Sequence, residues 1–165
     1  MKQLGIINPR NIPFKEGEKY KVRIAARAVV FDHKNMVALL YVSRDDYYKL
    51  PGGGVEDGED MSTGLRRECL EEIGCGIEIT GELGFTVEYW KEDIEKQVSY
   101  CYKAKVLGQK GKPNLTESEK AKGFGLLWVS HTKAIELLER CKPTQFEGEY
   151  IVPRELIFLR EAGNL

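Results

Sequence analysis

The chain has 165 residues, of which 42% are hydrophobic and 31% are charged, and its formal net charge is −1. This length favours a single domain over residues 1–165, and the composition is that of an ordinary globular protein. The near-neutral charge argues against a general nucleic-acid binder, which would need a basic excess, and no apolar run reaches the length of a membrane span. We therefore expect neither nucleic acid nor a membrane as a partner.

Residues 1–20 contain two prolines and few paired apolar positions, which predicts an extended N-terminal arm. This stretch lacks the apolar core of a secretory signal.

The four cysteines form no C-x-x-C pair, so we do not expect a zinc site of that type. Buried, reduced thiols and a cytoplasmic location are the expectation, because disulfides belong to oxidising compartments.

The next segments predict a hairpin. Residues 21–32 alternate and are rich in β-branched side chains, which favours a strand, and residues 36–42 follow a polar turn as its partner strand. The glycine-rich segment 50–54 is expected to stop any regular element. Residues 60–73 have helical spacing, with Asp60 as the N-cap and Gly74 at the left-handed C-terminal position.

The rest of the chain continues to mix strands and helices. Strands are predicted over residues 77–89, 97–107 and 126–129, and helices over residues 132–141 and 153–162. Residues 110–122 are polar and predict a long loop, which is often functional in a compact domain. Because the two kinds of element interleave, we expect an α/β fold with a mixed sheet covered by helices.

Three carboxylates of the predicted helix share one face, because Glu68, Glu71 and Glu72 are spaced i, i+3 and i+4. A cation among them would remove their mutual repulsion, and oxygen-only ligands favour Mg²⁺, with Mn²⁺ as an alternative. Arg67 precedes Glu71 by four residues and can steady it through an ion pair. Taken alone this spacing is weak support for a metal site, since the chain has 26 acidic residues.

The order of residues is far more specific than the spacing. The segment resembles the Nudix box of MutT-like hydrolases, G-x5-E-x7-R-E-U-x-E-E-x-G-U, in which U is a bulky apolar residue. All seven fixed positions match, at Gly53, Glu59, Arg67, Glu68, Glu71, Glu72 and Gly74. With ordinary residue frequencies, a chance match is on the order of one in a million. The sequence departs from the family at both U positions, which are Cys69 and Cys75, and at Gly64, where the family usually has alanine.

The resemblance implies a Nudix-type α/β/α sandwich whose box forms a catalytic loop-helix-loop. It implies that Glu68, Glu71 and Glu72 bind the metal, Mg²⁺ or Mn²⁺, together with the backbone carbonyl of Gly52. Glu59 and Arg67 would then be catalytic-site residues that orient these carboxylates. Gly53 would let the backbone approach a substrate phosphate closely. By analogy with the family, a homodimer is possible.

Four further residues are candidates for catalysis and substrate binding. The resemblance implies that the general base is either Glu68 or a loop residue, for which Glu119 fits the family position best and Glu117 is second. Arg23 and Arg27 lie on the same face of the first strand, and one of them could contact phosphate.

The resemblance implies Mg²⁺-dependent hydrolysis of a pyrophosphate bond in a nucleoside diphosphate-linked compound, first of all a (deoxy)nucleoside triphosphate. An ADP-ribose or nucleotide-sugar pyrophosphatase is the second prediction. It is weakened because no proline follows the box until Pro113. A non-catalytic nucleotide-binding Nudix module is the third.

Overall fold

The computed structural model describes residues 1–13, 21–91 and 95–163, so part of the predicted arm, residues 14–20, lies outside the described residues. The strands are β1 (Gln3–Ile7), β2 (Lys21–Phe31), β3 (Met36–Val42), β4 (Tyr47–Lys49), β5 (Gly52–Gly54), β6 (Gly76–Lys91), β7 (Glu95–Leu107) and β8 (Phe124–Ser130). The helices are α1 (Met61–Ile73), α2 (Glu117–Ala121), α3 (His131–Arg140) and α4 (Phe146–Gly163).

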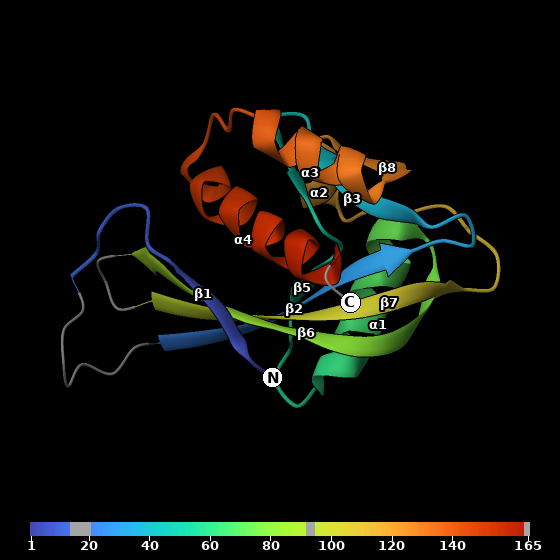
Figure 1. Ribbon diagram of the computed structural model, residues 1–165, viewed down its shortest axis with the longest axis horizontal. Helices are drawn as coiled ribbons and strands as arrows, with labels where there is room; N and C mark the ends of the chain where they lie inside the picture. Colours follow the sequence, from blue (N-terminus) through green and yellow to red (C-terminus); the bar gives the residue numbers. More distant parts are fainter. Residues whose placement is uncertain (14–20, 92–94, 164–165) are drawn as a thin grey trace.

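The strands form one mixed sheet in the order β1-β6-β7-β2-β3-β4, with β5 pairing β2 and β8 pairing β3. The pairs β1–β6 and β2–β7 are parallel, and the remaining pairs are antiparallel. Helix α1 covers one face of the sheet, and α3 and α4 cover the other (Figure 1). The predicted α/β/α sandwich with a mixed sheet is therefore confirmed.

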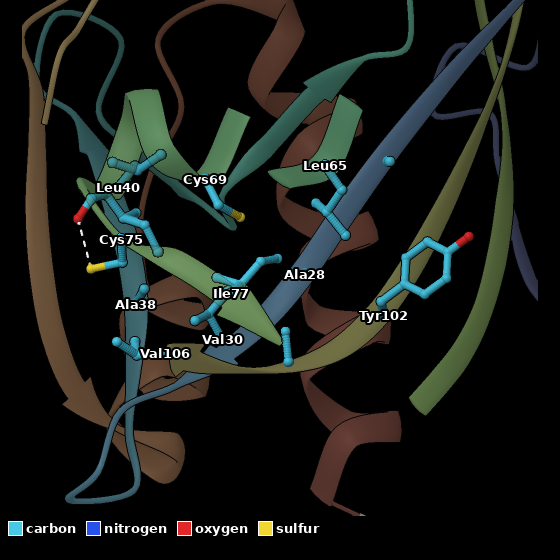
Figure 2. Close-up of a cluster of buried hydrophobic side chains, with 13 residues drawn as sticks. Ala28, Val30, Ala38, Leu40, Leu65, Cys69, Cys75, Ile77, Tyr102 and Val106 are labelled. Atoms are coloured by element: carbon cyan, nitrogen blue, oxygen red, sulfur yellow. Dashed lines mark hydrogen bonds between the residues drawn. The ribbon is translucent and has the colours of Figure 1, made fainter. Parts of the chain in front are cut away.

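The sheet separates two apolar cores. On the α1 side, Leu65 and Cys69 pack over Ala28, Val30 and Ile77 (Figure 2). On the other side, side chains from α3 and α4 pack on the opposite face of the sheet. The central strand β2 contributes to both cores, so residues 25–30 are all buried and the alternation expected for this strand does not appear in its burial.

Local signals determine helix α1 as predicted. The Asp60 side chain accepts hydrogen bonds from the backbone N–H groups of Ser62 and Thr63, and these bonds hold the pKa of Asp60 well below its usual range. Gly74 has a left-handed φ of 64°, and its N–H donates to the carbonyl of Leu70. The Cys69 side chain is fully buried, so the expected buried thiol is confirmed.

Four expectations about the elements were wrong in part. Among the described residues, β3 pairs with β2 at one position and pairs along its length with β8, because β5 and β7 occupy the two edges of β2. The glycine segment forms β5 instead of ending regular structure, and the predicted loop contains α2. Helix α4 begins at Phe146, well before Pro153, because the tertiary packing of its buried side chains outweighs the one backbone hydrogen bond that an interior proline removes.

No helix in the described part of the chain is both long enough and apolar enough to cross a membrane.

Candidate active site

The glycine turn of the box is pressed against the central strand. Strand β5 pairs antiparallel with β2, so that Gly52 lies opposite Arg27 and Gly53 lies opposite Ala26. A Cβ atom at Gly52 would lie 2.2 Å from the carbonyl oxygen of Ala26, and the φ of Gly52 is +126°. Only glycine can adopt this conformation at this distance, and the result is a backbone turn held rigidly beside α1.

One guanidinium gathers three of the predicted carboxylates beside this turn. Arg67 donates to both oxygens of Glu59 at 3.2 Å, to Glu68 at 3.0 Å and to Glu71 at 3.5 Å. It also donates to the carbonyl of Gly54 at 3.3 Å. The hydrogen bonds from Arg67 lower the pKa of Glu59 and, reciprocally, raise the pKa of Arg67. Thus Arg67 holds the three carboxylates close together at the turn.

Gly53 is required for the position of Glu68. A Cβ atom at Gly53 would lie 2.4 Å from the Glu68 carboxylate. We expect Gly53→Ala to reduce turnover by on the order of 10²-fold, because it would displace the Glu68 carboxylate, for which the resemblance to the Nudix box predicts a catalytic role. We expect the melting temperature to change little, because the clash is with the end of a flexible side chain. Parallel turnover and thermal-unfolding measurements test this, and a variant with wild-type turnover would contradict it.

The fourth predicted carboxylate lies apart from the other three. Glu72 is 1% exposed, and its two oxygens accept hydrogen bonds from the Gly52 N–H at 2.7 Å and from the Lys49 ammonium at 2.5 Å. Burial raises the pKa of Glu72, while the Lys49 charge opposes that shift. Sequence analysis missed Lys49, since nothing local connects it with a residue 23 positions away.

The two predicted substrate arginines differ in exposure. Arg23 is exposed, and its guanidinium lies close to Gly54, with Nη2 3.2 Å from the position of a Cβ atom there. Arg27 is buried, and its Nε and Nη1 atoms have no hydrogen-bond partner among the described residues. Burial lowers the pKa of Arg27. The predicted pair therefore contains one side chain that solvent reaches and one that it does not.

Glu119 is placed in α2, where it completes a capping box. Its carboxylate accepts from the backbone N–H of Thr116 at 2.7 Å, and the Thr116 hydroxyl accepts from the Glu119 N–H at 3.3 Å. This carboxylate is thus engaged at the start of a short helix.

The carboxylates of the box and the Gly52 carbonyl are oxygen ligands that suit a hard divalent cation. In this structure Arg67 and Lys49 contact them instead. Among residues 1–13, 21–91 and 95–163, no three Asp, Glu, His or Cys side chains stand in a ready-made metal cage. Arg67 contacts one group of carboxylates, and Lys49 contacts Glu72. Two predicted ligands nevertheless converge on one cation, because the Gly52 carbonyl and the Glu72 carboxylate both face the Lys49 ammonium at 3.3 and 2.5 Å. Oxygen donors of this kind fit Mg²⁺ or Mn²⁺.

A cleft of about 580 Å³ adjoins the box between β2 and the loop that precedes α1. Its lining includes Lys21, Arg23, Val55, Glu59, Met61 and Tyr100. The volume is within the usual range of small-molecule sites, and the lining combines the acidic side chains of Glu56, Asp57 and Glu59 with basic, aromatic and apolar groups.

A profile of the NUDIX domain matches residues 21–148, which is most of the chain. The chain belongs to the Nudix family. Relatives with curated names include an RNA pyrophosphohydrolase of Dinoroseobacter shibae, 36% identical over 70 residues that cover 42% of this chain and 44% of that protein. Another RNA pyrophosphohydrolase, from a Sulfurovum strain, is 32% identical over 76 residues, covering 44% and 48%. The chain thus spans about half the length, or less, of these relatives.

Solved Nudix structures share the fold. A NUDIX hydrolase from Nitrosomonas europaea superimposes with a TM-score of 0.65 at 17% identity, covering 87% of this chain and 90% of that one. A MutT protein from Methanosarcina mazei Go1 gives 0.59 at 20% identity, covering 89% and 96%. The predicted resemblance to MutT-like Nudix proteins is therefore confirmed for the family and the fold.

Proposed function

We propose that this Nudix protein is a Mg²⁺-dependent hydrolase that cleaves a pyrophosphate bond in a nucleoside triphosphate. The observation that carries the proposal is the gathering of Glu59, Glu68 and Glu71 around Arg67 beside the glycine turn. Such a concentration of carboxylates at a backbone turn is the arrangement that a cation-assisted phosphate reaction needs. Membership of the Nudix family supports the same conclusion.

Glu68, Glu71, Glu72 and the carbonyl of Gly52 would hold the metal. When bound, Mg²⁺ would neutralise phosphate charge and lower the pKa of a water molecule, and Mn²⁺ would fit the same oxygen ligands. Arg67 and Glu59 act as positioning residues, because the bidentate pair between them fixes the guanidinium that in turn contacts Glu68.

Glu68 is the general base that we favour. Its carboxylate lies against Gly53 and is 15% exposed, so it could take a proton from the attacking water beside the turn. Glu119 is the alternative, and its carboxylate would first have to leave the capping box.

The substrate phosphates would lie near Gly53 and Gly54, within reach of Arg23. We assign the phosphate contact to Arg23 because it is exposed at the cleft beside Gly54, whereas Arg27 is buried. The aromatic and apolar part of the cleft, which includes Tyr100 and Val55, would receive the nucleoside.

The triphosphate at the 5′ end of an RNA is a second candidate substrate. Two curated relatives are named RNA pyrophosphohydrolases, and such an RNA end presents the same triphosphate and ribose as a free nucleotide. Two basic side chains, Lys21 and Arg23, line the cleft and could contact the following backbone phosphates. This candidate departs from the prediction that no nucleic acid is bound.

One assay tests the proposal. The protein is incubated with Mg²⁺ and nucleoside triphosphates, nucleotide sugars, ADP-ribose or a 5′-triphosphorylated RNA, and release of phosphate and pyrophosphate is measured. We expect release from at least one triphosphate and its loss when EDTA removes the metal. No release from any compound would favour a non-catalytic nucleotide-binding module. Release from ADP-ribose or a nucleotide sugar alone would show that the protein is a pyrophosphatase of that class and does not act on triphosphates.

The four cysteines are unpaired, which supports a reducing compartment, and we propose the cytoplasm. The homodimer stays a prediction, which analytical ultracentrifugation would test.

A further inference from the structure

Lys49 is a buried cation at the end of β4, and none of the box positions predicts it. Its ammonium lies at the point where the Gly52 carbonyl and the Glu72 carboxylate converge, at 3.3 and 2.5 Å. The ring of Phe124 closes a third side, with its centroid 5.1 Å from the ammonium. The side chain is 10% exposed, so the charge is largely removed from water.

The two oxygen atoms that Lys49 contacts are those that the proposed function assigns to the metal. An ammonium and a divalent ion cannot share this position, because like charges a few ångströms apart repel strongly away from water. We propose that Lys49 is a tethered counter-ion of the metal site: it holds Glu72 and Gly52 in place and competes with the divalent cation for them. This inference rests on the proposed function, specifically on metal binding by Glu72 and Gly52.

The burial of Glu72 explains why a competing lysine is useful. A carboxylate that is 1% exposed needs a partner charge, and without Lys49 it would lose the cation in direct contact with it, leaving only the more distant charge of Arg27 whenever the metal is absent. Lys49 also keeps the turn attached to α1, since Glu72 accepts from the Gly52 N–H at the same time. The flexible four-carbon stem of lysine allows the ammonium to move away when the metal enters. Lys49 thus keeps Glu72 and Gly52 in place in the absence of the metal, and the metal binds less tightly because it must displace the ammonium.

Binding of Mn²⁺ alone tests this inference without any measurement of hydrolysis. Free Mn²⁺ is followed by electron paramagnetic resonance during titration of the wild type and of Lys49→Met. We expect the variant to bind Mn²⁺ at least about tenfold more tightly, because the competing cation is gone. We also expect Mn²⁺ to raise the melting temperature of the variant by more than that of the wild type, because tighter binding adds stability to the folded state alone.

Lys110→Met is the matched control. Lys110 is also paired with a buried carboxylate, that of Asp32 at 2.5 Å, and its ammonium lies 3.6 Å from the ring centroid of Trp128. It contacts neither Glu72 nor Gly52, so this variant should bind Mn²⁺ with wild-type affinity. Tighter binding by both variants would overturn the proposal, because it would reflect a general loss of positive charge.

Each of the other outcomes either supports or overturns the proposal for Lys49. If Lys49→Met and the wild type bind Mn²⁺ with equal affinity, the proposal for Lys49 is overturned and the proposed function is unaffected. If the wild type binds no Mn²⁺, both the proposal and the proposed function are overturned, because both depend on a bound metal. If Lys49→Met folds only when Mn²⁺ is present, the metal has replaced the missing ammonium and the proposal stands. If it folds under neither condition, the neutral variant Lys49→Gln takes its place in the same titration. The double variant Lys49→Met with Glu72→Gln should lose the gain in affinity, and retention of that gain would overturn the proposal.

Discussion

Glu71→Gln should lower turnover of the cleaved substrate in Mg²⁺ by on the order of 10²–10³-fold, the usual effect of removing one electrostatic stabiliser from an active site. The fold should be preserved, because Glu71 is 35% exposed and its contact with Arg67, at 3.5 Å, is the longest of the three carboxylate contacts in this cluster. The change in the free energy of unfolding should stay within about 0.5 kcal/mol. Turnover at saturating Mg²⁺ and denaturant unfolding are the measurements.

Glu136→Gln is the matched control for this prediction, since Glu136 is a half-exposed helical glutamate with one ion pair, to Lys133 on α3. Its turnover should equal that of the wild type. Wild-type turnover of Glu71→Gln would show that Glu71 is not a ligand. Glu72→Gln is a poorer test, because it would leave the buried ammonium of Lys49 without its counter-ion and so would change stability together with activity.

Arg154→Met should give the largest loss of stability among single substitutions away from the box. Arg154 bridges two carboxylates, with Nη1 3.1 Å from Glu88 and Nη2 2.6 Å from Glu155, and none of the three side chains is more than 1% exposed. Removing the cation takes away the partner that both buried carboxylates contact directly and leaves them only the more distant charge of Arg27, which costs about 3–5 kcal/mol. The melting temperature should fall by roughly 10 °C for a chain of this size. Denaturant and thermal unfolding both measure the effect.

Two further variants separate charge from packing in this prediction. Arg160→Met on the same helix removes a surface ion pair with Glu139, and its unfolding midpoint should be close to that of the wild type. Combining Arg154→Met with Glu88→Gln and Glu155→Gln removes the uncompensated charges and should recover most of the loss. An unchanged midpoint for Arg154→Met alone would contradict the buried-charge explanation.

Much of helix α1 could be predicted because its signals are local. The Asp60 cap and the left-handed Gly74 depend on the backbone of the next or previous turn, and both lie where the sequence placed them. The helical period also placed Arg67 beside Glu71, and the ion pair between them is present. Strand β2 was also predicted from a local signal, the alternation and the β-branched side chains of residues 21–32.

The failures concern pairings between distant segments. The hairpin prediction for β3 assumed that neighbours in sequence pair in space, whereas β3 pairs mainly with β8, about ninety residues further on. Strand β5 consists of three glycines, which have no propensity for strands, and it forms because β2 offers it a free edge. Interior Pro153 was taken as the beginning of a helix, and only the packed surface of α4 shows that the helix continues through it.

The sequence alone determined the family, the position of helix α1 and the carboxylates that share one face of it, because these depend on residue order and on the 3.6-residue helical period. The tertiary structure alone decided which of these carboxylates meet water. Helical period fixes the angle between Glu71 and Glu72, but burial depends on what packs against each, and here the glycine turn and Lys49 cover Glu72. That contact joins residues 23 positions apart. As a result, the acidic face of α1 has an exposed carboxylate, Glu71, and a buried one, Glu72.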